Sequence, residues 1–119
     1  MKEKKKAWLY GRISDRDKNE LLAYQMDILE DYARKHDYAI VGSTRAFDSG
    51  KSLDSYFMMY LTSSVIAEYM DCILVYSTNR LLLDPEKFEE FELICKMHNV
   101  SIITIKWWDL NAYEVHLLL

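Results

Sequence analysis

Two kinds of hydrophobic pattern alternate along the chain. Short, nearly continuous apolar runs are typical of buried β-strands, whereas apolar residues that recur every three or four positions are typical of amphipathic helices. The apolar runs predict four strands, at residues 7–13, from 38–41 onward to 47, at 72–76 and at 100–105. The longer periodic segments between them predict three helices, at residues 19–36, 56–70 and 85–98.

The third predicted helix has the clearest start. Asp84 supplies a side chain that can cap the first backbone N–H groups, and Pro85 suits the first helical position because its missing N–H needs no partner there. Phe88, Phe91 and Cys95 then continue an apolar stripe at helical spacing. We therefore expect this helix to begin at residue 85.

The regular order of strands and helices predicts the fold class. A crossover long enough for a helix between successive strands is typical of a parallel sheet. The sequence therefore predicts a single α/β domain with a mostly parallel central sheet flanked by helices on both faces. Sites in such sheets lie at the carboxyl ends of the strands. Three polar clusters follow predicted strands and are expected to meet there: Arg12-Ile13-Ser14, Asp48-Ser49-Gly50 and Ser77-Thr78-Asn79-Arg80.

The chemical feature of these clusters is a serine close to two arginines. Ser14 lies two residues after Arg12, so both side chains point to the same side of an extended segment. Arg80, from another strand end, supplies a second guanidinium that can hold phosphate oxygens. A serine beside fixed cations suits attack on a phosphodiester, whose transition state spreads negative charge over its oxygens. An acyl-transfer triad fits less well, because no G-x-S-x-G sequence surrounds Ser14.

Each of these residues also has a purely structural interpretation, which is the commoner one for a single residue. The alternatives are a loop or capping role for Ser14, and ion pairs of Arg12 with Asp15 or Asp48 and of Arg80 with Asp84. Gly50-Lys51-Ser52 matches the end of a phosphate-binding loop. The earlier glycine of that motif is missing, so we treat the match as accidental.

Composition limits the size and the charge of the domain. With 119 residues, of which 50% are hydrophobic, the chain is long enough for one core and too short for two. Four lysines and one glutamate give residues 1–6 a net charge of +3, so the other 113 residues carry −7 of the total of −4. An acidic body repels polyphosphates, whereas general nucleic-acid binders have a basic footprint. Any contact with DNA is therefore expected through a local site or another segment.

The cysteines and the hydropathy pattern indicate the cellular compartment in which the protein is expected. Cys72 and Cys95 have neither C-x-x-C spacing nor a nearby histidine pair, which predicts buried free thiols rather than a zinc site. No apolar stretch approaches the roughly 20 residues that cross a bilayer, and no signal peptide follows the basic tip. We expect a cytoplasmic protein with no metal and no membrane partner.

Several motifs, taken in order, resemble one known family. They are Tyr10-Gly11-Arg12-Ile13-Ser14, Gln25 in the first helix, Ser49-Gly50 with Ser52-Leu53-Asp54, and Asn79-Arg80-Leu81 after an apolar strand. Their order and spacing over residues 7–105 are similar to those of the catalytic domain of the serine recombinases, the resolvase and invertase family. The resemblance implies a resolvase-like fold and an enzyme that cuts and rejoins DNA at specific sites.

The resemblance also implies roles for individual residues. Ser14 matches the nucleophile that becomes linked to the DNA 5′ phosphate, and Arg12 and Arg80 match arginines that bind the scissile phosphate. The expected substrate-binding positions are Gln25, Ser49, Gly50 and Asn79. Members need no metal or other cofactor, because the phosphoserine bond conserves the energy for rejoining. They act as dimers or tetramers, so the expected partners are DNA, held through a segment outside this chain, and an identical or related recombinase domain.

Three positions depart from the family pattern, and each lacks a usual charge. Asn79 stands where a carboxylate is usual, and Leu83 and Ser55 stand where arginines are usual. The cations that could replace the missing arginines are Arg16, Arg45 and Lys51. Charge removed from a phosphoryl-transfer site costs several kcal/mol of transition-state stabilisation per group, so impaired activity is expected.

The expected organisation is a basic tip at residues 1–6, a resolvase-like catalytic domain at 7–106 and an extension at 107–119. The extension, with Trp107 and Trp108, is expected either to start a dimerisation helix or to pack on the domain. The alternative function is a non-catalytic, recombinase-like module that binds or regulates another protein. A third interpretation, a flavodoxin-like ligand-binding domain, depends on the alternating pattern alone and lacks a convincing phosphate loop.

Overall fold

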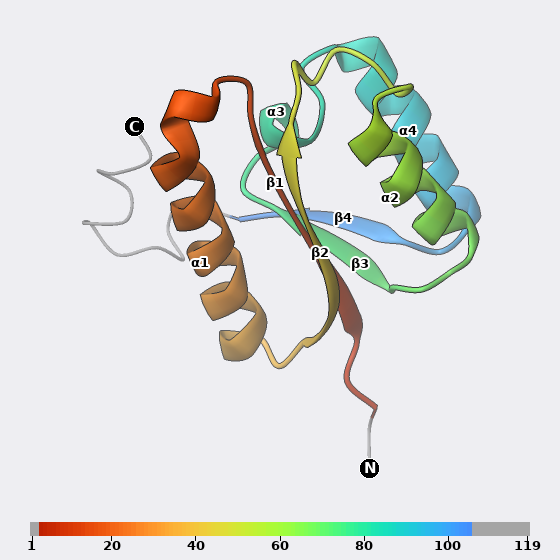
Figure 1. Cartoon of the computed structure of the whole chain (residues 1–119). Coiled ribbons are helices and arrows are strands. Elements are labelled where there is room, and N and C mark those ends of the chain that lie inside the picture. The colour runs from red at the N-terminus through yellow and green to blue at the C-terminus, as the bar shows by residue number, and fades with distance from the viewer. Residues whose placement is uncertain (1–2, 106–119) are drawn as a thin grey trace.

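Four parallel strands form the centre of the structure. The computed structural model describes residues 3–105, and its strands are β1 (Lys6–Ile13), β2 (Ala39–Phe47), β3 (Cys72–Val75) and β4 (Ser101–Thr104). Their order in the sheet is β2-β1-β3-β4, and all neighbouring pairs run parallel (Figure 1). The predicted α/β domain with a mostly parallel sheet is therefore confirmed. The predicted extension at 107–119 lies outside the described residues.

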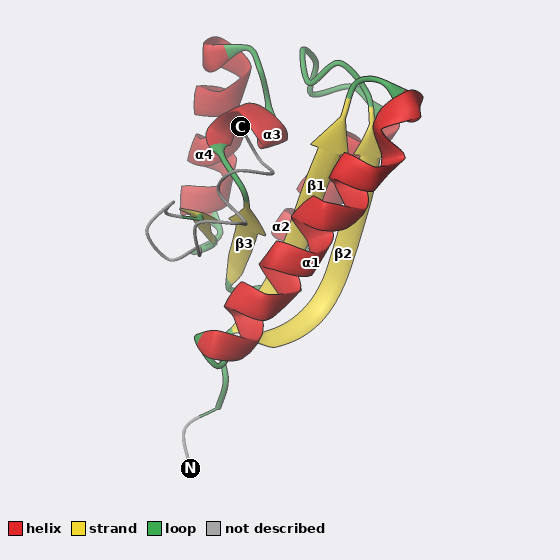
Figure 2. Cartoon of the chain, turned by 90° about the vertical axis from the view of Figure 1, so that its left-hand side faces the viewer, coloured by secondary structure: helices red, strands yellow, loops and turns green. Residues whose placement is uncertain are grey.

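Helices cover both faces of the sheet. α1 (Asn19–Lys35) lies along one face, and α2 (Tyr56–Ile66) and α4 (Pro85–Met97) lie together on the other (Figure 1, Figure 2). A 3-10 turn, η1 (Arg16–Lys18), precedes α1, and the one-turn helix α3 (Thr78–Leu81) follows β3. Within residues 3–105 no helix is long and apolar enough to span a membrane.

The alternation of side chains along β1 builds two hydrophobic clusters of the same domain, one on each face of the sheet. Trp8 and Tyr10 belong to a buried cluster with residues of α2 and α4, whereas Ala7 and Leu9 belong to a cluster with residues of α1. A strand covered on both faces needs apolar residues at every position rather than at every second one. This requirement explains the continuous apolar run, in which Arg12 is the buried charged residue.

One predicted boundary is wrong, while the others agree within one residue. The second helix ends at Ile66 rather than at residue 70, because Glu68 takes a left-handed conformation with φ of 58°. The segment after β3, for which no helix was predicted, contains α3. A helix of one turn is too short to produce a detectable hydrophobic period.

The predicted start of α4 is confirmed in detail. The Asp84 carboxylate accepts hydrogen bonds from the N–H groups of Glu86 (2.9 Å) and Lys87 (3.4 Å). Pro85 occupies the first helical position. Two orphan N–H groups of the first turn are thus satisfied by the side chain that the sequence pattern indicates.

The two cysteines are free and buried, as predicted. Burial, followed by the nearby Asp71, raises the pKa of Cys72 to about 11. Burial, followed by Glu92, raises the pKa of Cys95 to about 12. Both side chains are therefore protonated thiols at neutral pH, and a protonated buried thiol is a poor nucleophile.

The three helices that lead into strands end in the same way. Asp37, Glu68 and Asn99 have φ of 60°, 58° and 58°. The N–H of the following residue then bonds to a carbonyl five positions earlier, at distances between 2.8 and 3.2 Å. Glycine is the usual residue at such helix ends, since a Cβ clashes with the backbone there. Asp and Asn tolerate the conformation better than Glu does.

We expect Glu68→Gly to raise the free energy of unfolding by about 1 kcal/mol, because glycine removes the Cβ strain of a left-handed residue. Asn99→Gly, at the equivalent position after α4, is the matched comparison and should gain less. Chemical denaturation of both variants measures the difference. A loss of stability in Glu68→Gly, or equal gains in the two variants, would contradict the strain argument.

Candidate functional site

The side chain of Arg12 lies at the centre of the site and is only 2% exposed. Its Nη1 donates hydrogen bonds to Ser14 Oγ (3.0 Å) and to the Asp48 carbonyl (3.0 Å), and its Nη2 donates to the Asn79 carbonyl (2.6 Å). One guanidinium thus joins the segments that follow β1, β2 and β3. The predicted convergence of the three polar clusters is confirmed.

Ser14 is the first residue after β1 and is exposed. Its Oγ accepts the hydrogen bond from Arg12 and keeps its own O–H for another partner. The capping role considered for Ser14 belongs instead to Asp15, whose carboxylate accepts from the Asp17 N–H (3.0 Å) and caps η1. The structure therefore places Ser14 as an accessible hydroxyl beside a buried cation.

Gln25 fixes the backbone of Arg12 from the side of α1. Its Oε1 accepts from the Arg12 N–H (3.3 Å), and its Nε2 donates to the Arg12 carbonyl (3.2 Å). The side chain is fully buried, and both ends of its amide are used inside the protein. This predicted substrate-binding residue thus lies behind Arg12, where it orients the strand end.

The loop after β2 closes over Arg12 at Gly50. Gly50 has a φ of +70°, and a Cβ built there would lie 2.7 Å from Arg12 Cζ, so both the backbone and the guanidinium require glycine. The Asp48 carboxylate accepts from the Gly50 N–H (2.9 Å), and the Gly50 carbonyl accepts from the Leu83 N–H (2.6 Å). Of the two predicted site residues in this loop, Gly50 covers Arg12 and Ser49 is exposed.

Asn79 and Arg80 both belong to α3 but are used differently. The backbone carbonyl of Asn79 binds Arg12, and the residue is exposed. Arg80 is half-buried, and its Nη1 donates to the Arg12 carbonyl at 3.4 Å, which engages one of its five N–H groups. The alternative ion pair of Arg80 with Asp84 is not formed, and Asp84 caps α4 instead. Arg80 is therefore the arginine with donors to spare at this edge.

The environment of Arg12 is polar but incompletely paired. Around Arg12, the Tyr10 hydroxyl, Arg12 Nε and Asp48 Oδ2 are buried and have no hydrogen-bond partner within residues 3–105. Burial lowers the pKa of Arg12, an effect that Asp48 opposes and Arg80 reinforces. Burial, followed by Asp48, raises the pKa of Tyr10, so its hydroxyl stays protonated at neutral pH.

Tyr10 was not among the predicted site residues. A signal for it exists in the sequence, since Tyr10, Arg12 and Ser14 alternate along β1 and its continuation and therefore share one side of the strand. The electrostatic coupling of Tyr10 to Arg12 and Asp48 places it next to the buried guanidinium.

The three cations that could replace the missing arginines lie in different surroundings. Arg16 lies over an aromatic ring of β2, with 5.7 Å between its Cζ and the ring centroid. Arg45 lines a hollow with aromatic residues of α2. Lys51 directly follows Gly50 and lines a hollow of about 300 Å³ together with Leu83. Of the three, Lys51 is the cation on the loop that covers Arg12.

The other positions of departure hold neutral groups. Ser55 Oγ accepts from the Met58 N–H (3.2 Å) and caps α2, so this residue has a structural role. Leu83 is 43% exposed and is joined to the Gly50 loop through its backbone. The exposed margin of the site therefore contains an apolar side chain where the family pattern has an arginine.

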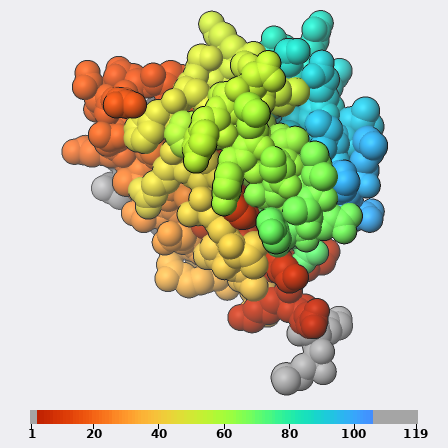
Figure 3. Space-filling model, turned by 45° about the vertical axis from the view of Figure 1, so that its right-hand side comes forward, coloured from red at the N-terminus to blue at the C-terminus, as the bar shows by residue number. Residues whose placement is uncertain are grey.

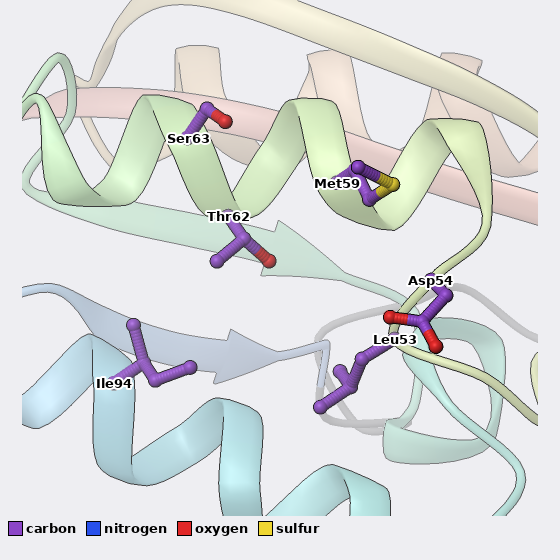
Figure 4. Close-up of a pocket in the computed structure, with 6 residues that line it drawn as sticks. All are labelled: Leu53, Asp54, Met59, Thr62, Ser63 and Ile94. Carbon is purple, nitrogen blue, oxygen red and sulfur yellow. The ribbon is translucent and has the colours of Figure 1, made fainter.

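A separate groove lies between α2 and α4 (Figure 4). It has a volume of about 310 Å³, and Leu53, Met59 and Ile94 contribute apolar surface to it. Of the described residues that line it, Asp54 is the only charged one, so they include no pair of nucleophile and cation. Among the described residues, no group of His, Cys, Asp and Glu is placed to hold a metal ion. The strand-end cluster around Arg12 is therefore the candidate site.

Several solved structures share this fold. The C-terminal catalytic domain of ISC1926 TnpA, an IS607-like serine recombinase, has a TM-score of 0.80 and 25% identity, and the match covers 93% of this chain and 75% of that one. The N-terminal catalytic domain of TP901-1 integrase has a TM-score of 0.79 and 21% identity, and the match covers 96% of this chain and 89% of that one. A resolvase family site-specific recombinase from Streptococcus pneumoniae has a TM-score of 0.74 and 21% identity, and the match covers 97% of this chain and 83% of that one. The sequence itself matches no family model and no curated protein.

These similarities define the class of the fold as that of site-specific recombinase domains. More specifically, the chain has the fold of the serine recombinase catalytic domain, and the resemblance seen in its motifs is confirmed at this level. The roles of Ser14, Arg12 and Arg80 remain predictions that the geometry now makes specific.

We expect Gln25→Met to lower the free energy of unfolding by about 1–3 kcal/mol, because the Arg12 N–H and carbonyl lose buried partners. Ser64→Ala is the matched control. Ser64 is also buried, but among the residues that the structure describes its hydroxyl bonds only to the carbonyl of Tyr60 one turn earlier (3.0 Å), so its loss should be smaller. Equal losses in the two variants, measured by chemical denaturation, would contradict the positioning role of Gln25.

Proposed function

We propose that this chain is the catalytic domain of a site-specific serine recombinase, which cleaves and rejoins DNA strands through Ser14. The observation that carries the proposal is the hydrogen bond from Arg12 Nη1 to Ser14 Oγ (3.0 Å), with Arg80 at the same strand edge. The fold that the chain shares with serine recombinase domains supports it. The substrate is then a phosphodiester of DNA.

In the proposed cleavage step, Ser14 Oγ attacks phosphorus and the bond from phosphorus to the 3′ oxygen breaks. The serine proton passes to solvent, the 3′ oxygen takes up a proton as it leaves, and the DNA 5′ phosphate stays on Ser14. Rejoining reverses these steps with a new 3′ hydroxyl. Because Arg12 donates to Oγ, it stabilises the negative charge that develops there as the proton leaves.

We assign the contact with the scissile phosphate to Arg80. Within the part of the chain that the structure describes, Arg80 makes one long hydrogen bond, to the Arg12 carbonyl, which leaves most of its donors free, and a guanidinium fork fits two phosphate oxygens. Lys51 adds positive charge from the Gly50 loop. Ser49 and Asn79 are exposed on the two flanking segments and are assigned to the DNA backbone.

We also propose that the rate is lower than in a site with the full set of arginines. Ser55 is committed to capping α2, and Leu83 presents a neutral side chain beside the Gly50 loop. Electrostatic stabilisation of the transition state is usually the largest single contribution to catalysis of this kind. A positive charge can be restored at Leu83, because a leucine side chain makes no hydrogen bond that would be lost. At Ser55 the same change would remove the cap of α2.

The catalytic domain is assigned to residues 7–106, and recognition of the DNA sequence to a segment outside them. Outside the basic tip the chain carries a net charge of −7, which disfavours long-range attraction of DNA. We place the reaction in the cytoplasm, where free thiols such as Cys72 and Cys95 persist.

A second candidate function is a non-catalytic interaction module, which the outer face of α2 favours. α2 contains no charged residue, and Tyr56, Met59 and Tyr60 are 76%, 57% and 54% exposed. This surface lies between β2 and α4 in Figure 3. Its proposed occupant is a second copy of the domain, since two uncharged apolar faces can cover each other around a two-fold axis. Such a module would form no covalent intermediate with DNA.

A trapping experiment distinguishes the two functions. The chain is fused to a sequence-specific DNA-binding module, so that DNA is held near the site, and is given duplexes in which a sulfur atom replaces one 3′ bridging oxygen. The released thiol rejoins poorly, so an intermediate accumulates. We expect the protein to gain the mass of a 5′-phosphoryl strand, which peptide mass spectrometry locates on Ser14.

The same experiment on Ser14→Ala should give no adduct, because the attacking oxygen is gone. Ser101→Ala is the matched control, since Ser101 is an exposed serine at the opposite end of the sheet and should react like the wild type. An adduct that persists in Ser14→Ala would refute the assignment of the nucleophile. A wild-type chain that forms no adduct would favour the interaction module.

We expect Leu83→Arg to raise the rate of adduct formation by roughly tenfold to a hundredfold, because a guanidinium beside the Gly50 loop stabilises the charge of the transition state. Leu83→Gln, which is polar and uncharged, is the control and should change the rate little. Single-turnover kinetics with the sulfur-containing DNA measure both. Equal rates in the two variants would show that missing charge at residue 83 does not limit the reaction.

A further inference from the structure

The family resemblance assigns Arg12 to the scissile phosphate, yet the residue is only 2% exposed and its guanidinium is already bonded to protein oxygens. We propose that Arg12 acts on Ser14 and on the protein backbone rather than on phosphate: it holds the segments after β1, β2 and β3 together and orients Ser14, while Arg80 is the arginine that contacts phosphate. The catalytic consequence rests on the proposed function. The structural part of the proposal, that Arg12 holds the three segments together, does not depend on the proposed function.

The hydrogen-bond donors of Arg12 are largely committed. A guanidinium has five N–H groups, two on each Nη and one on Nε. Those of Nη1 bond to Ser14 Oγ and to the Asp48 carbonyl, and one of Nη2 bonds to the Asn79 carbonyl. Two N–H groups remain without a partner among the described residues, that of Nε and the second of Nη2. A Cβ on Gly50 would lie 2.8 Å and 3.1 Å from these two nitrogens, so a two-point contact with a phosphate through them would require the Gly50 loop to move.

The residue is also held on every side that the structure describes. Behind it, Gln25 makes two hydrogen bonds to its backbone, and Arg80 donates to its carbonyl. Above it, a Cβ on Gly50 would approach Arg12 Cζ to 2.7 Å and Nε to 2.8 Å, which shows how closely that loop lies on the guanidinium. The Gly50 loop is in turn bonded to the Leu83 N–H. The guanidinium cannot swing outward unless this loop moves.

Arg80 has the opposite character. It is half-buried, and its hydrogen bond to the Arg12 carbonyl is long, at 3.4 Å. The two arginines therefore have different roles, since Arg12 binds groups of the protein itself and Arg80 is available to bind a phosphate of DNA. Loss of Arg12 should then loosen both neighbouring segments and slow the chemical step, whereas loss of Arg80 should weaken the binding of DNA.

The first test compares Arg12→Lys with Arg80→Lys by amide hydrogen exchange without DNA. Lysine keeps the charge but cannot make three directed hydrogen bonds. We expect exchange in residues 48–51 and 78–81 to be faster by about tenfold or more in Arg12→Lys, and by less than about threefold in Arg80→Lys. Unchanged protection of β3 shows that each variant is folded. A folded Arg12→Lys variant with unchanged exchange in these segments overturns the proposal.

A measurement on the wild-type chain decides the same point if Arg12→Lys does not fold. In ¹⁵N NMR, the bonded guanidinium hydrogens of Arg12 should exchange with water at least about 100-fold more slowly than those of the exposed Arg34. Equal exchange rates overturn the proposal.

The second test uses the sulfur-containing DNA and the fused chain. We expect Arg12→Lys to lower the saturating rate of adduct formation by roughly 100-fold while the half-saturating DNA concentration stays unchanged, and Arg80→Lys to raise that concentration. An equal rise in both variants overturns the proposal, because Arg12 then contributes to binding as Arg80 does. If the wild type forms no adduct, the proposed function fails, and hydrogen exchange still decides whether Arg12 holds the three segments.

Discussion

The need to satisfy one buried cation governs the geometry of the site. Removing a guanidinium from water is costly unless oxygen atoms surround it. For Arg12 these oxygens include carbonyls that lie 36 and 67 residues away in the sequence. They can be brought together only because β1 lies between β2 and β3 in the sheet. The strand order therefore places both carbonyls around Arg12, and Arg12 in turn fixes the position of Ser14.

The site contains few charged side chains, and the direction in which each one points matters more for its chemistry than the net charge. Arg12 is directed inward, towards carbonyls and the Ser14 hydroxyl, whereas Arg80 keeps its donors at the surface. The Asp48 carboxylate opposes the loss of positive charge on Arg12, but one of its oxygens is left unpaired. A site built in this way can fix a nucleophile firmly and still provide only modest stabilisation for a phosphate.

The sequence predicted the framework well because its signals are local. The apolar run of β1, the cap and proline at the start of α4, and the spacing of Arg12 and Ser14 all follow from short-range periodicity. The burial of Arg12 could not be predicted, because it depends on carbonyls from distant segments. The one-turn helix α3 was missed because four residues show no period.

The central claim is that an exposed serine, oriented by a buried arginine, attacks DNA so that the protein remains on a 5′ phosphate. The most direct test is the chemistry of the DNA ends after cleavage by the fused chain. The account predicts a free 3′ hydroxyl that terminal transferase extends once unmodified DNA is cut, and a 5′ end that stays linked to the protein, or to a Ser14 peptide after proteolysis. A protein-linked 3′ end, or cleavage that leaves both ends free of protein, would contradict it.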